Sequence, residues 1–307
     1  MTTLSALDLL RHACHGCGAC CTGHSVRLVR DEPARIQAAA VALGIDNPVV
    51  DTPRGPVLGF VDHHCPFLDP ARRCRIHATW GEAAKPAVCQ QYPLRSIVVE
   101  DGQRVAIDPG CGSNWTVWQT GPALDVGDLL PAPERRHSPE EVGIERALLG
   151  LLDPQRAPLS AVLATLAGQP DTAALRDGFA ARSLARVQEL NLAALLAHEA
   201  PTLKPALGPV ASLPPTARWP SLTPTQGAFV LELARRSVFL RNGTIRPMEL
   251  GLVLGTFIGA VVCAADNPPE DTFGYRMTAW TRLLRLPAAW TALFPEPSTL
   301  RWLATGQ

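Results

Sequence analysis

Eight of the nine cysteines lie between Cys14 and Cys111 of the 307-residue chain, in a pattern that can bind a metal. Gly16 and Gly18 separate the first of them and allow the unusual backbone angles that a tight loop needs. Spacings of two residues let a single turn of backbone direct successive sulfurs at one ion. The eight cysteines are Cys14, Cys17, Cys20, Cys21, Cys65, Cys74, Cys89 and Cys111.

The spacing favours a metal or cluster over disulfides, because the N-terminus lacks the basic segment and apolar core of a signal peptide. Eight thiolates suffice for two tetrahedral zinc sites or for one 4Fe–4S cluster with four ligands. The order is neither that of radical S-adenosylmethionine enzymes nor that of bacterial ferredoxins, since His24 stands where a cysteine would follow. His15 and His24 are either ligands or polar neighbours. Adjacent side chains usually point apart, so we expect Cys20 and Cys21 not to bind one iron together.

Composition excludes several function classes. Lys and Arg number 28, as do Asp and Glu, which argues against a broad basic surface for nucleic acid. Charged residues are 18% and hydrophobic residues 47%, which excludes wholesale disorder. Reduced thiols and the lack of a signal peptide predict a cytoplasmic protein.

The chain divides by composition into a cysteine domain at 1–120, a linker at 121–137 and a helical domain at 138–307. We therefore predict a mainly α fold in which a cysteine-rich, metal-binding domain with short β-hairpins precedes an α-helical domain. One hairpin is expected over 95–108 with a type I′ turn at Asp101-Gly102, and another over 49–61. A helix is expected from Glu32 to Leu43, with Gly44 ending it.

The second half shows helical periodicity. Ser138 and Glu141 form a capping-box signature that starts one helix. Others are expected at 158–167, 172–199, 225–241 and 247–265, with two shorter ones after Tyr275; Asn242-Gly243 would end the helix at 225–241. Seven prolines between 201 and 224 predict an extended strap.

The segment 247–265 is apolar enough to be weighed as a membrane helix. Its uninterrupted apolar stretch falls short of the about 20 residues that cross a bilayer. Gly251, Gly255 and Gly259 recur every fourth residue and form a smooth face for a neighbouring helix. We predict a buried core helix, no membrane association, and an apolar packing role for Cys263.

Several motifs resemble a known family. After the Cys14–Cys21 stretch come Cys-Pro-Phe-Leu-Asp at 65–69, Arg-Cys-Arg-Ile-His at 73–77, Gly-Glu-x-Ala at 81–84 and Cys-x2-Tyr-Pro at 89–93. Together, over roughly 12–115, they resemble the CxxCxxCC zinc- or iron-chelating family. Within it they look most like the flagellin lysine-N-methylases.

This resemblance implies an iron–sulfur cluster, most simply 4Fe–4S, with zinc as the alternative, and methylation of a flagellin-like protein by S-adenosylmethionine. The eight clustered cysteines become the ligand pool. Tyr92, in a turn fixed by Pro93, becomes the catalytic candidate that contacts the lysine amine, against the alternative of simple packing. Arg95 could bind a carboxylate, and Asp69 and Glu82 could accept hydrogen bonds or a proton; Asp69 is equally explained as a turn former.

Two other functions fit the same residues. One is a non-enzymatic module in which the metal organises the first 120 residues and the helices bind a partner. The other is a metal-handling protein, indicated by more thiols than one site needs. No Gly-x-Gly-x-x-Gly motif marks a nucleotide cradle.

Overall fold

The computed structural model describes residues 4–6 (backbone only), 10–14, 16–22, 26–124, 126, 132–212, 218–240 and 248–307. The strands are β1 (Leu4–Ala6), β2 (Val49–Thr52), β3 (Gly55–Leu58), β4 (Leu94–Val99) and β5 (Gly102–Ile107). The first helices are η1 (Ala19–Cys21), α1 (Glu32–Leu43), α2 (Arg75–Trp80), η2 (Glu82–Ala84), α3 (Ala87–Gln91) and α4 (Asn114–Val117). His15, His24 and Asn242-Gly243 lie outside the described residues.

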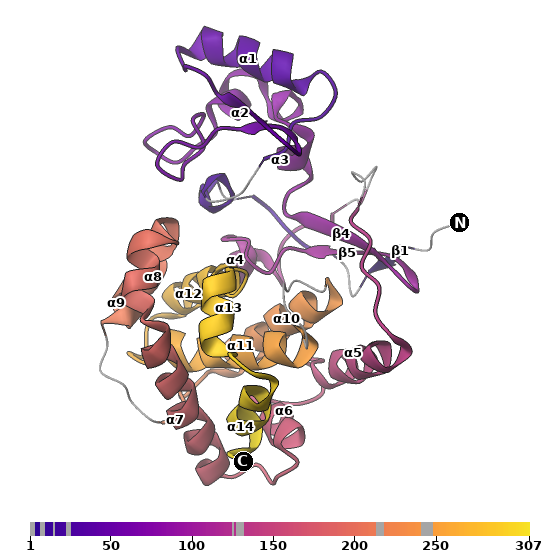
Figure 1. Ribbon diagram of the computed structural model, residues 1–307, viewed down its shortest axis with the longest axis vertical. Coiled ribbons are helices and arrows are strands. Elements are labelled where there is room, and N and C mark those ends of the chain that lie inside the picture. Colours follow the sequence, from indigo (N-terminus) through magenta and orange to yellow (C-terminus); the bar gives the residue numbers. More distant parts are fainter. Residues whose placement is uncertain are drawn as a thin grey trace.

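The remaining helices form the larger part of the molecule. They are α5 (Pro139–Leu151), α6 (Leu159–Ala167), α7 (Ala173–Leu190), α8 (Leu192–His198), η3 (Pro201–Leu203), α9 (Lys204–Ala211), α10 (Pro224–Phe239), α11 (Met248–Cys263), α12 (Glu270–Leu283), α13 (Pro287–Leu293) and α14 (Pro297–Thr305). Figure 1 shows a small lobe with α1, α2 and α3, a sheet of β4, β5 and β1 beneath it, and the helical lobe below. The predicted mainly α class, with hairpins before the helices, is confirmed.

The small lobe has its own modest core. Helix α1 begins and ends as predicted, and Gly44 ends it with φ 65°. The second predicted hairpin is also present, as β2 and β3 joined at Pro53-Arg54, with Val49 opposite Leu58. Seven buried side chains fill this lobe: Val26, Leu28, Ile36, Ala40, Leu58, Phe67 and Ile76. Cys65, Cys74 and Cys89 pack against that core, so the core positions three of the clustered thiols.

The first predicted hairpin is confirmed, but its turn differs. Val99 pairs with Gly102, so the two turn residues are Glu100 and Asp101 rather than Asp101-Gly102. Only Gly102 of these has a positive φ, 128°, and the type I′ prediction is therefore wrong. A type I′ turn needs a positive φ at both central residues, whereas here only Gly102, directly after the turn, has one. Strand β1 adds parallel to β5, a pairing that the sequence did not predict.

Helix α11 is the centre of the helical lobe. It contacts α10, α12, α7, α14 and α5, and the residues from Leu252 to Val262 are buried. The predicted glycine face is confirmed: Gly251 lies against Trp290, Gly255 against Leu284 and Gly259 against Trp280. Cys263 is fully buried. Among the described helices, none combines the length and apolarity required to span a bilayer.

Helix starts were predicted better than helix lengths. The capping box of Ser138 and Glu141 starts α5, as expected. The expected helix at 172–199 is two helices, because Asn191 takes a left-handed conformation with φ 49° between α7 and α8. Helix α12 starts before Tyr275, earlier than expected, and two short helices follow it.

The predicted extended strap at 201–224 is wrong for its first half. Residues 201–211 form η3 and α9. Pro201 and Pro205 stand in the first turns, where the missing N–H costs nothing, and Pro209 is accepted within α9. Of the rest of the strap, the structure describes Ser212 and residues 218–224, and α10 starts at Pro224.

The hairpin β4–β5 and helix α4 pack on the helical lobe. Ala106 shares a core cluster with Phe239 and Leu240 of the α10 region. Two residues of the expected linker bind β4: Val98 N donates to Pro133 O, and Arg135 N donates to Val98 O. The domain boundaries at 120 and 138 stay a prediction. The residues before 120 nevertheless divide between the two lobes, since the β4–β5 hairpin packs on the helices while α1, α2 and α3 lie in the small lobe.

The glycine face of α11 provides a stability test. A Cβ on Gly259 would lie 2.2 Å from Trp280 Cδ1. Trp280 is fully buried and its indole donates to Gly255 O at 2.8 Å, so the ring cannot move away easily. We expect Gly259→Ala to lower the free energy of unfolding in urea by about 1–3 kcal/mol.

The matched control is Gly143→Ala on the exposed side of α5, where a Cβ meets nothing within 4 Å. It should keep or raise stability by up to about 1 kcal/mol, because alanine favours helix. Equal stability of the two variants would contradict the close packing of α11 on α12.

Candidate metal centre

The first cysteines lie in a loop that reaches between the two lobes. Gly16 (φ 64°) and Gly18 (φ 67°) have the positive angles that the sequence predicted. Gly18 precedes η1, and a Cβ on it would lie 3.0 Å from the backbone of Arg72. Cys65 N donates to Cys21 O at 2.9 Å, which joins the loop to the turn after β3. Local geometry therefore brings the first cysteine group to the second.

Cys20 and Cys21 point the same way. Their sulfurs are 3.9 Å apart, so the expectation that they point apart is wrong. The short turn of η1, which a left-handed Gly18 starts, places both sulfurs on one side of the loop. The hydrogen bond to Cys21 is the largest influence on Cys20 and lowers the pKa of that thiol to about 7.

Three further thiols lie within range of the charge of this pair. Cys65 lies in the turn after β3, Cys74 immediately precedes α2, and Cys89 lies on α3. Burial raises the pKa of Cys65 to about 11 and of Cys89 to about 12, and neighbouring thiols of the group add to each increase. Thiols that raise one another's pKa lie within range of each other's charge, and binding of a cation would relieve that repulsion.

Two cations stand beside these sulfurs, and sequence reasoning did not assign either to the site. Lys85 and Arg282 both help lower the pKa of Cys20. Lys85 lies in the small lobe and Arg282 on α12, so both lobes contribute a cation that lowers the pKa of Cys20. The signal for Lys85 was visible, since the chain has only two lysines and this one follows the Gly-Glu-x-Ala motif. Arg282 had no recognisable motif.

Cys17 and Cys111 form a second, neighbouring pair of thiols. Cys17 Sγ lies 4.0 Å from Ser113 Oγ, and a Cβ on Gly112 would lie 2.8 Å from that sulfur. Burial raises the pKa of Cys111 to about 12, and Cys17 contributes to the increase. Cys14 is exposed. Cys17 is exposed as well. The ligand role of the eight cysteines stays a prediction.

The spacing of the sulfurs bears on the type of centre. Among the described residues, no three cysteine sulfurs lie within 4.8 Å of one another. A tetrahedral zinc–thiolate site, with Zn–S of about 2.3 Å, needs sulfurs about 3.8 Å apart. In an iron–sulfur cluster each thiolate binds a different iron, so the sulfurs stand farther apart. Cys20 and Cys21, 3.9 Å apart, have the spacing of a zinc site, so the sulfur positions are compatible with zinc as well as with iron–sulfur ligation.

A buried carboxylate fixes the loop that carries Cys111. Asp108 is fully buried at the end of β5, and Arg285 binds both of its oxygens, at 2.5 and 3.0 Å. Gly110 N donates to the same carboxylate at 2.7 Å, and Asn114 Nδ2 donates to the Asp108 carbonyl at 2.8 Å. A carboxylate that is buried away from water needs a cation and hydrogen-bond donors of this kind to remain charged. Asp108 thus ties the loop to the region after α12.

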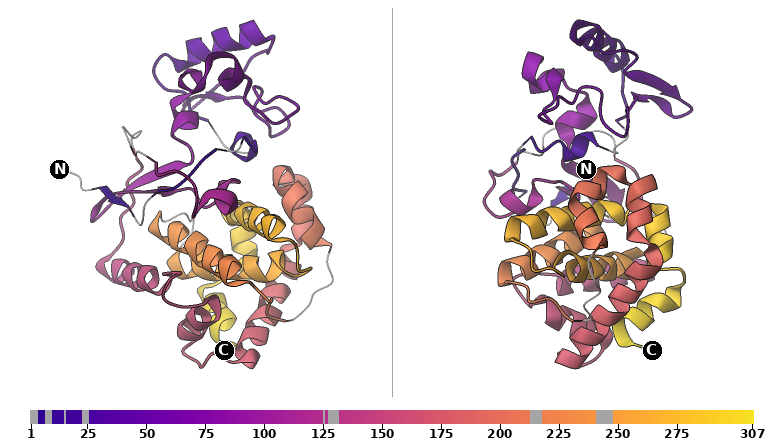
Figure 2. Two further views of the ribbon diagram at one scale, coloured as in Figure 1. Left: turned by 180° about the vertical axis from the view of Figure 1, so that it is seen from behind. Right: turned by 90° about the vertical axis from the view of Figure 1, so that its left-hand side faces the viewer.

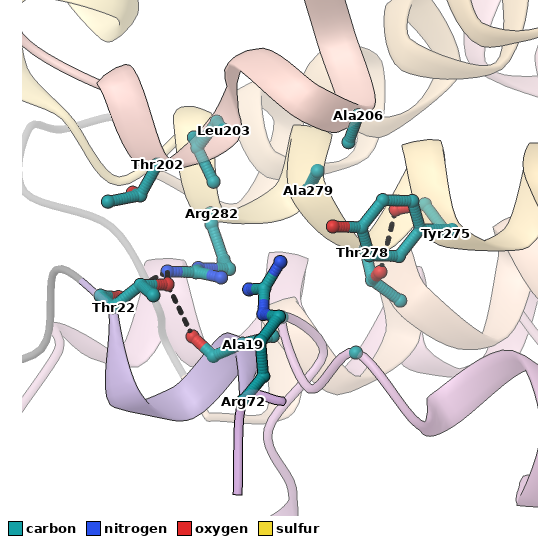
Figure 3. Close-up of a pocket in the computed structure, with 12 residues that line it drawn as sticks. Ala19, Thr22, Arg72, Thr202, Leu203, Ala206, Tyr275, Thr278, Ala279 and Arg282 are labelled. Atoms are coloured by element: carbon teal, nitrogen blue, oxygen red, sulfur yellow. Dashed lines mark hydrogen bonds between the residues drawn. The ribbon is translucent and has the colours of Figure 1, made fainter. Parts of the chain in front are cut away.

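A small pocket lies where the cysteine loop meets α9 and α12. Figure 3 shows Arg72 and Arg282 with their guanidinium groups side by side in it. Arg282 donates to Thr22 O at 2.5 Å, whereas Arg72 Nε is buried without a described hydrogen-bond partner. The space is about that of one water molecule, 10 Å³. Two cations at such a place favour an anionic group.

The other predicted residues lie at different distances from the thiols. Tyr92 precedes a cis Tyr92–Pro93 bond, and burial, then Asp108 and Cys111, raise its pKa well above the usual value. Asp69 accepts from Arg73 N at 2.7 Å, which confirms a turn former. Glu82 pairs with Lys85 at 3.2 Å. Arg95 pairs with Asp108 of its own chain at 3.5 Å, and its binding of a ligand carboxylate stays a prediction.

Residues 13–112, about a third of the chain, match the model of the CxxCxxCC family, described as a "putative zinc- or iron-chelating domain". The match contains all eight clustered cysteines. No curated protein and no solved structure shows a significant match to this chain. The chain therefore carries a cysteine-rich domain of the zinc- or iron-chelating kind.

Asp108→Asn tests how the site is anchored. The change leaves Arg285 without its charged partner, and we expect the free energy of unfolding to fall by about 3 kcal/mol, the lower end of the usual range for breaking a buried ion pair. The lower end applies because the Arg285 side chain is 21% exposed. Urea unfolding measures the loss, and alkylation followed by mass spectrometry should find Cys111 newly reactive.

Glu134→Gln is the control, because its partner Arg136 is exposed and surface pairs contribute little. It should change neither stability nor the alkylation of Cys111. An unchanged Asp108→Asn variant would contradict the anchoring role.

Proposed function

We propose that this protein binds an iron–sulfur cluster, of the 4Fe–4S type, through thiolates of the CxxCxxCC region. The observation that supports the proposal is that Cys20, Cys21, Cys65, Cys74 and Cys89 lie within range of one another's charge. Soft thiolates suit iron–sulfur clusters, and Lys85 and Arg282 favour the ionised form that ligation requires. The four ligands come from these five, with Cys17, Cys111 and Cys14 as the remaining pool.

Metal and acid-labile sulfide analysis of protein made without oxygen tests the proposal. Wild-type protein should be brown and contain iron and sulfide in equal amounts, about four of each per chain. Cys74→Ala should lose most of both, because it removes a thiol that influences Cys21, Cys65 and Cys89.

Cys263→Ala is the matched control: the same substitution in the fully buried α11, apart from the cluster. It should keep the wild-type iron and sulfide. Zinc without sulfide would replace the cluster by a zinc centre, and a colourless protein without metal would reject both.

Methylation of lysine on a protein such as flagellin is the second candidate function, and it comes from the likeness of the motifs at 65–93 to the lysine-N-methylases. The observation that favours it is the pair Arg72 and Arg282, which line one pocket together with Ala19 and Thr22 of the cysteine loop. Their guanidinium groups suit the carboxylate of S-adenosylmethionine. The pocket is far smaller than that molecule, so only its carboxylate end would reach the arginines.

In that reaction the amine nitrogen forms a bond to the methyl carbon, the carbon–sulfur bond breaks, and the amine loses a proton. S-adenosylmethionine supplies the methyl group when bound. Tyr92 stays protonated at neutral pH, because its pKa is raised. It would therefore orient the amine through a hydrogen bond rather than remove the proton, and the lysine would be neutralised by losing water around it.

Transfer of labelled methyl from S-adenosylmethionine to flagellin tests this candidate. Wild-type protein should label lysine, and Tyr92→Phe should lower the rate by about 100-fold, the lower end of the effect of a positioned proton donor. Iron content and the circular dichroism spectrum should stay unchanged in the variant.

Unchanged labelling by Tyr92→Phe would leave that residue a packing role. Absence of labelling by the wild type would favour the non-enzymatic alternative, in which the centre organises the small lobe and the helices bind a partner, or else metal handling.

A further inference from the structure

A second group of metal-ligating side chains lies away from the cysteines. His137, Glu145 and Glu249 each place a ligand atom within 4.8 Å of the other two. The Glu145 side chain is fully buried, and those of His137 and Glu249 are 3% and 7% exposed. Such burial is unusual for carboxylates, which normally need a cation or a full set of hydrogen bonds.

Three separate elements bring these residues together. His137 stands in the connector immediately before Ser138, the cap of α5. Glu145 lies on α5, and Glu249 lies in the first turn of α11. The backbone N–H of His137 donates to the carboxylate of Glu100 in the β4–β5 turn, which fixes the connector at this point.

Two of the facing atoms lack hydrogen bonds. His137 Nδ1 and Glu249 Oε1 are 3.0 Å apart, yet neither makes a hydrogen bond within the described part of the chain. Both are buried from water. When the His137 proton is on Nε2, both facing atoms present lone pairs, and a shared cation would satisfy them.

Glu145 already has a cationic neighbour that would hold it in place. Arg104 Nη1 donates to Glu145 Oε1 at 2.6 Å, and Asp101 binds the same guanidinium at 2.9 Å. An ionised carboxylate has about four lone-pair positions, so Glu145 can bind Arg104 and an ion together. Arg104 would then orient the ligand, as hydrogen-bonding neighbours of metal ligands commonly do.

We propose that His137, Glu145 and Glu249 bind a divalent transition-metal ion, such as Mn²⁺, Fe²⁺ or Zn²⁺, at a site independent of the thiolates. One imidazole and two carboxylates are donors that suit these ions. The ion would link the connector, α5 and α11, and through Arg104 also β5. It would therefore hold the sheet between the lobes against the helices.

Manganese is the probe that separates this site from the cysteines, because carboxylates suit Mn²⁺ and thiolates favour softer metals. Full-length protein is titrated with Mn²⁺, and free Mn²⁺ is followed by electron paramagnetic resonance. Wild type should bind one Mn²⁺ per chain. Glu249→Gln and His137→Gln should each weaken binding by roughly 10-fold or more, since even hydrogen-bonding neighbours of metal ligands contribute about 10–100-fold.

Glu140→Gln is the matched control, the same change at an exposed position of α5. It should bind as wild type does. Pulsed resonance should detect coupling of the bound Mn²⁺ to an imidazole nitrogen, and His137→Gln should lose it. Circular dichroism confirms that each variant is folded.

Absence of Mn²⁺ binding by the wild type would overturn the proposal and leave a buried His–Glu pair that shares a proton. Equal binding by wild type and by folded Glu249→Gln would also overturn it, as would binding without nitrogen coupling. The test does not depend on iron or sulfide content, so it can succeed or fail separately from the proposed cluster.

Discussion

The ion pair between the buried carboxylate of Asp108 and Arg285 is the interaction on which the packing of the Cys111 loop against the helices depends. Asp108 ends β5, starts the loop of Cys111, and binds Arg285, which lies 177 positions later in the chain. A fully buried charge is tolerated only because Arg285 and the Gly110 N–H replace the lost water. Thr281 Oγ1 adds a hydrogen bond to Pro109 O at 3.1 Å. These contacts fix the loop against α12, and they thereby fix the position of Cys111.

This anchoring places the thiols at a junction rather than inside one lobe. Cys65, Cys74 and Cys89 rest on the core of the small lobe, whereas Cys111 rests on the loop that Asp108 holds. In both views of Figure 2 the small lobe lies at one end of the molecule, above the helices. Lys85 and Arg282 approach Cys20 from opposite lobes. Any change in how the lobes pack would therefore alter the charge around Cys20.

Local signals were readable in the sequence, and long-range ones were not. Gly44 and the Ser138–Glu141 box predicted helix ends correctly, because caps act within a few residues. The same rules failed at 201–211, where prolines occupy positions that helices accept. The cysteine spacing predicted a metal-type site. It could not predict the Arg285–Asp108 pair or the meeting of His137 with Glu249, because nothing in the local pattern encodes contacts between segments so far apart.

The small lobe also explains why ligation and folding should be inseparable there. Its seven-residue core must order α1, a hairpin and the helices α2 and α3, which are six and five residues long. Helices of that length are unstable alone, since nucleation is unfavourable. A structural metal contributes about 10–16 kcal/mol in small metal-binding folds, enough to supply what such a core lacks. In the proposed cluster, ligation of Cys74 and Cys89 would hold the turns before them, and the binding site would be part of the lobe's own stability.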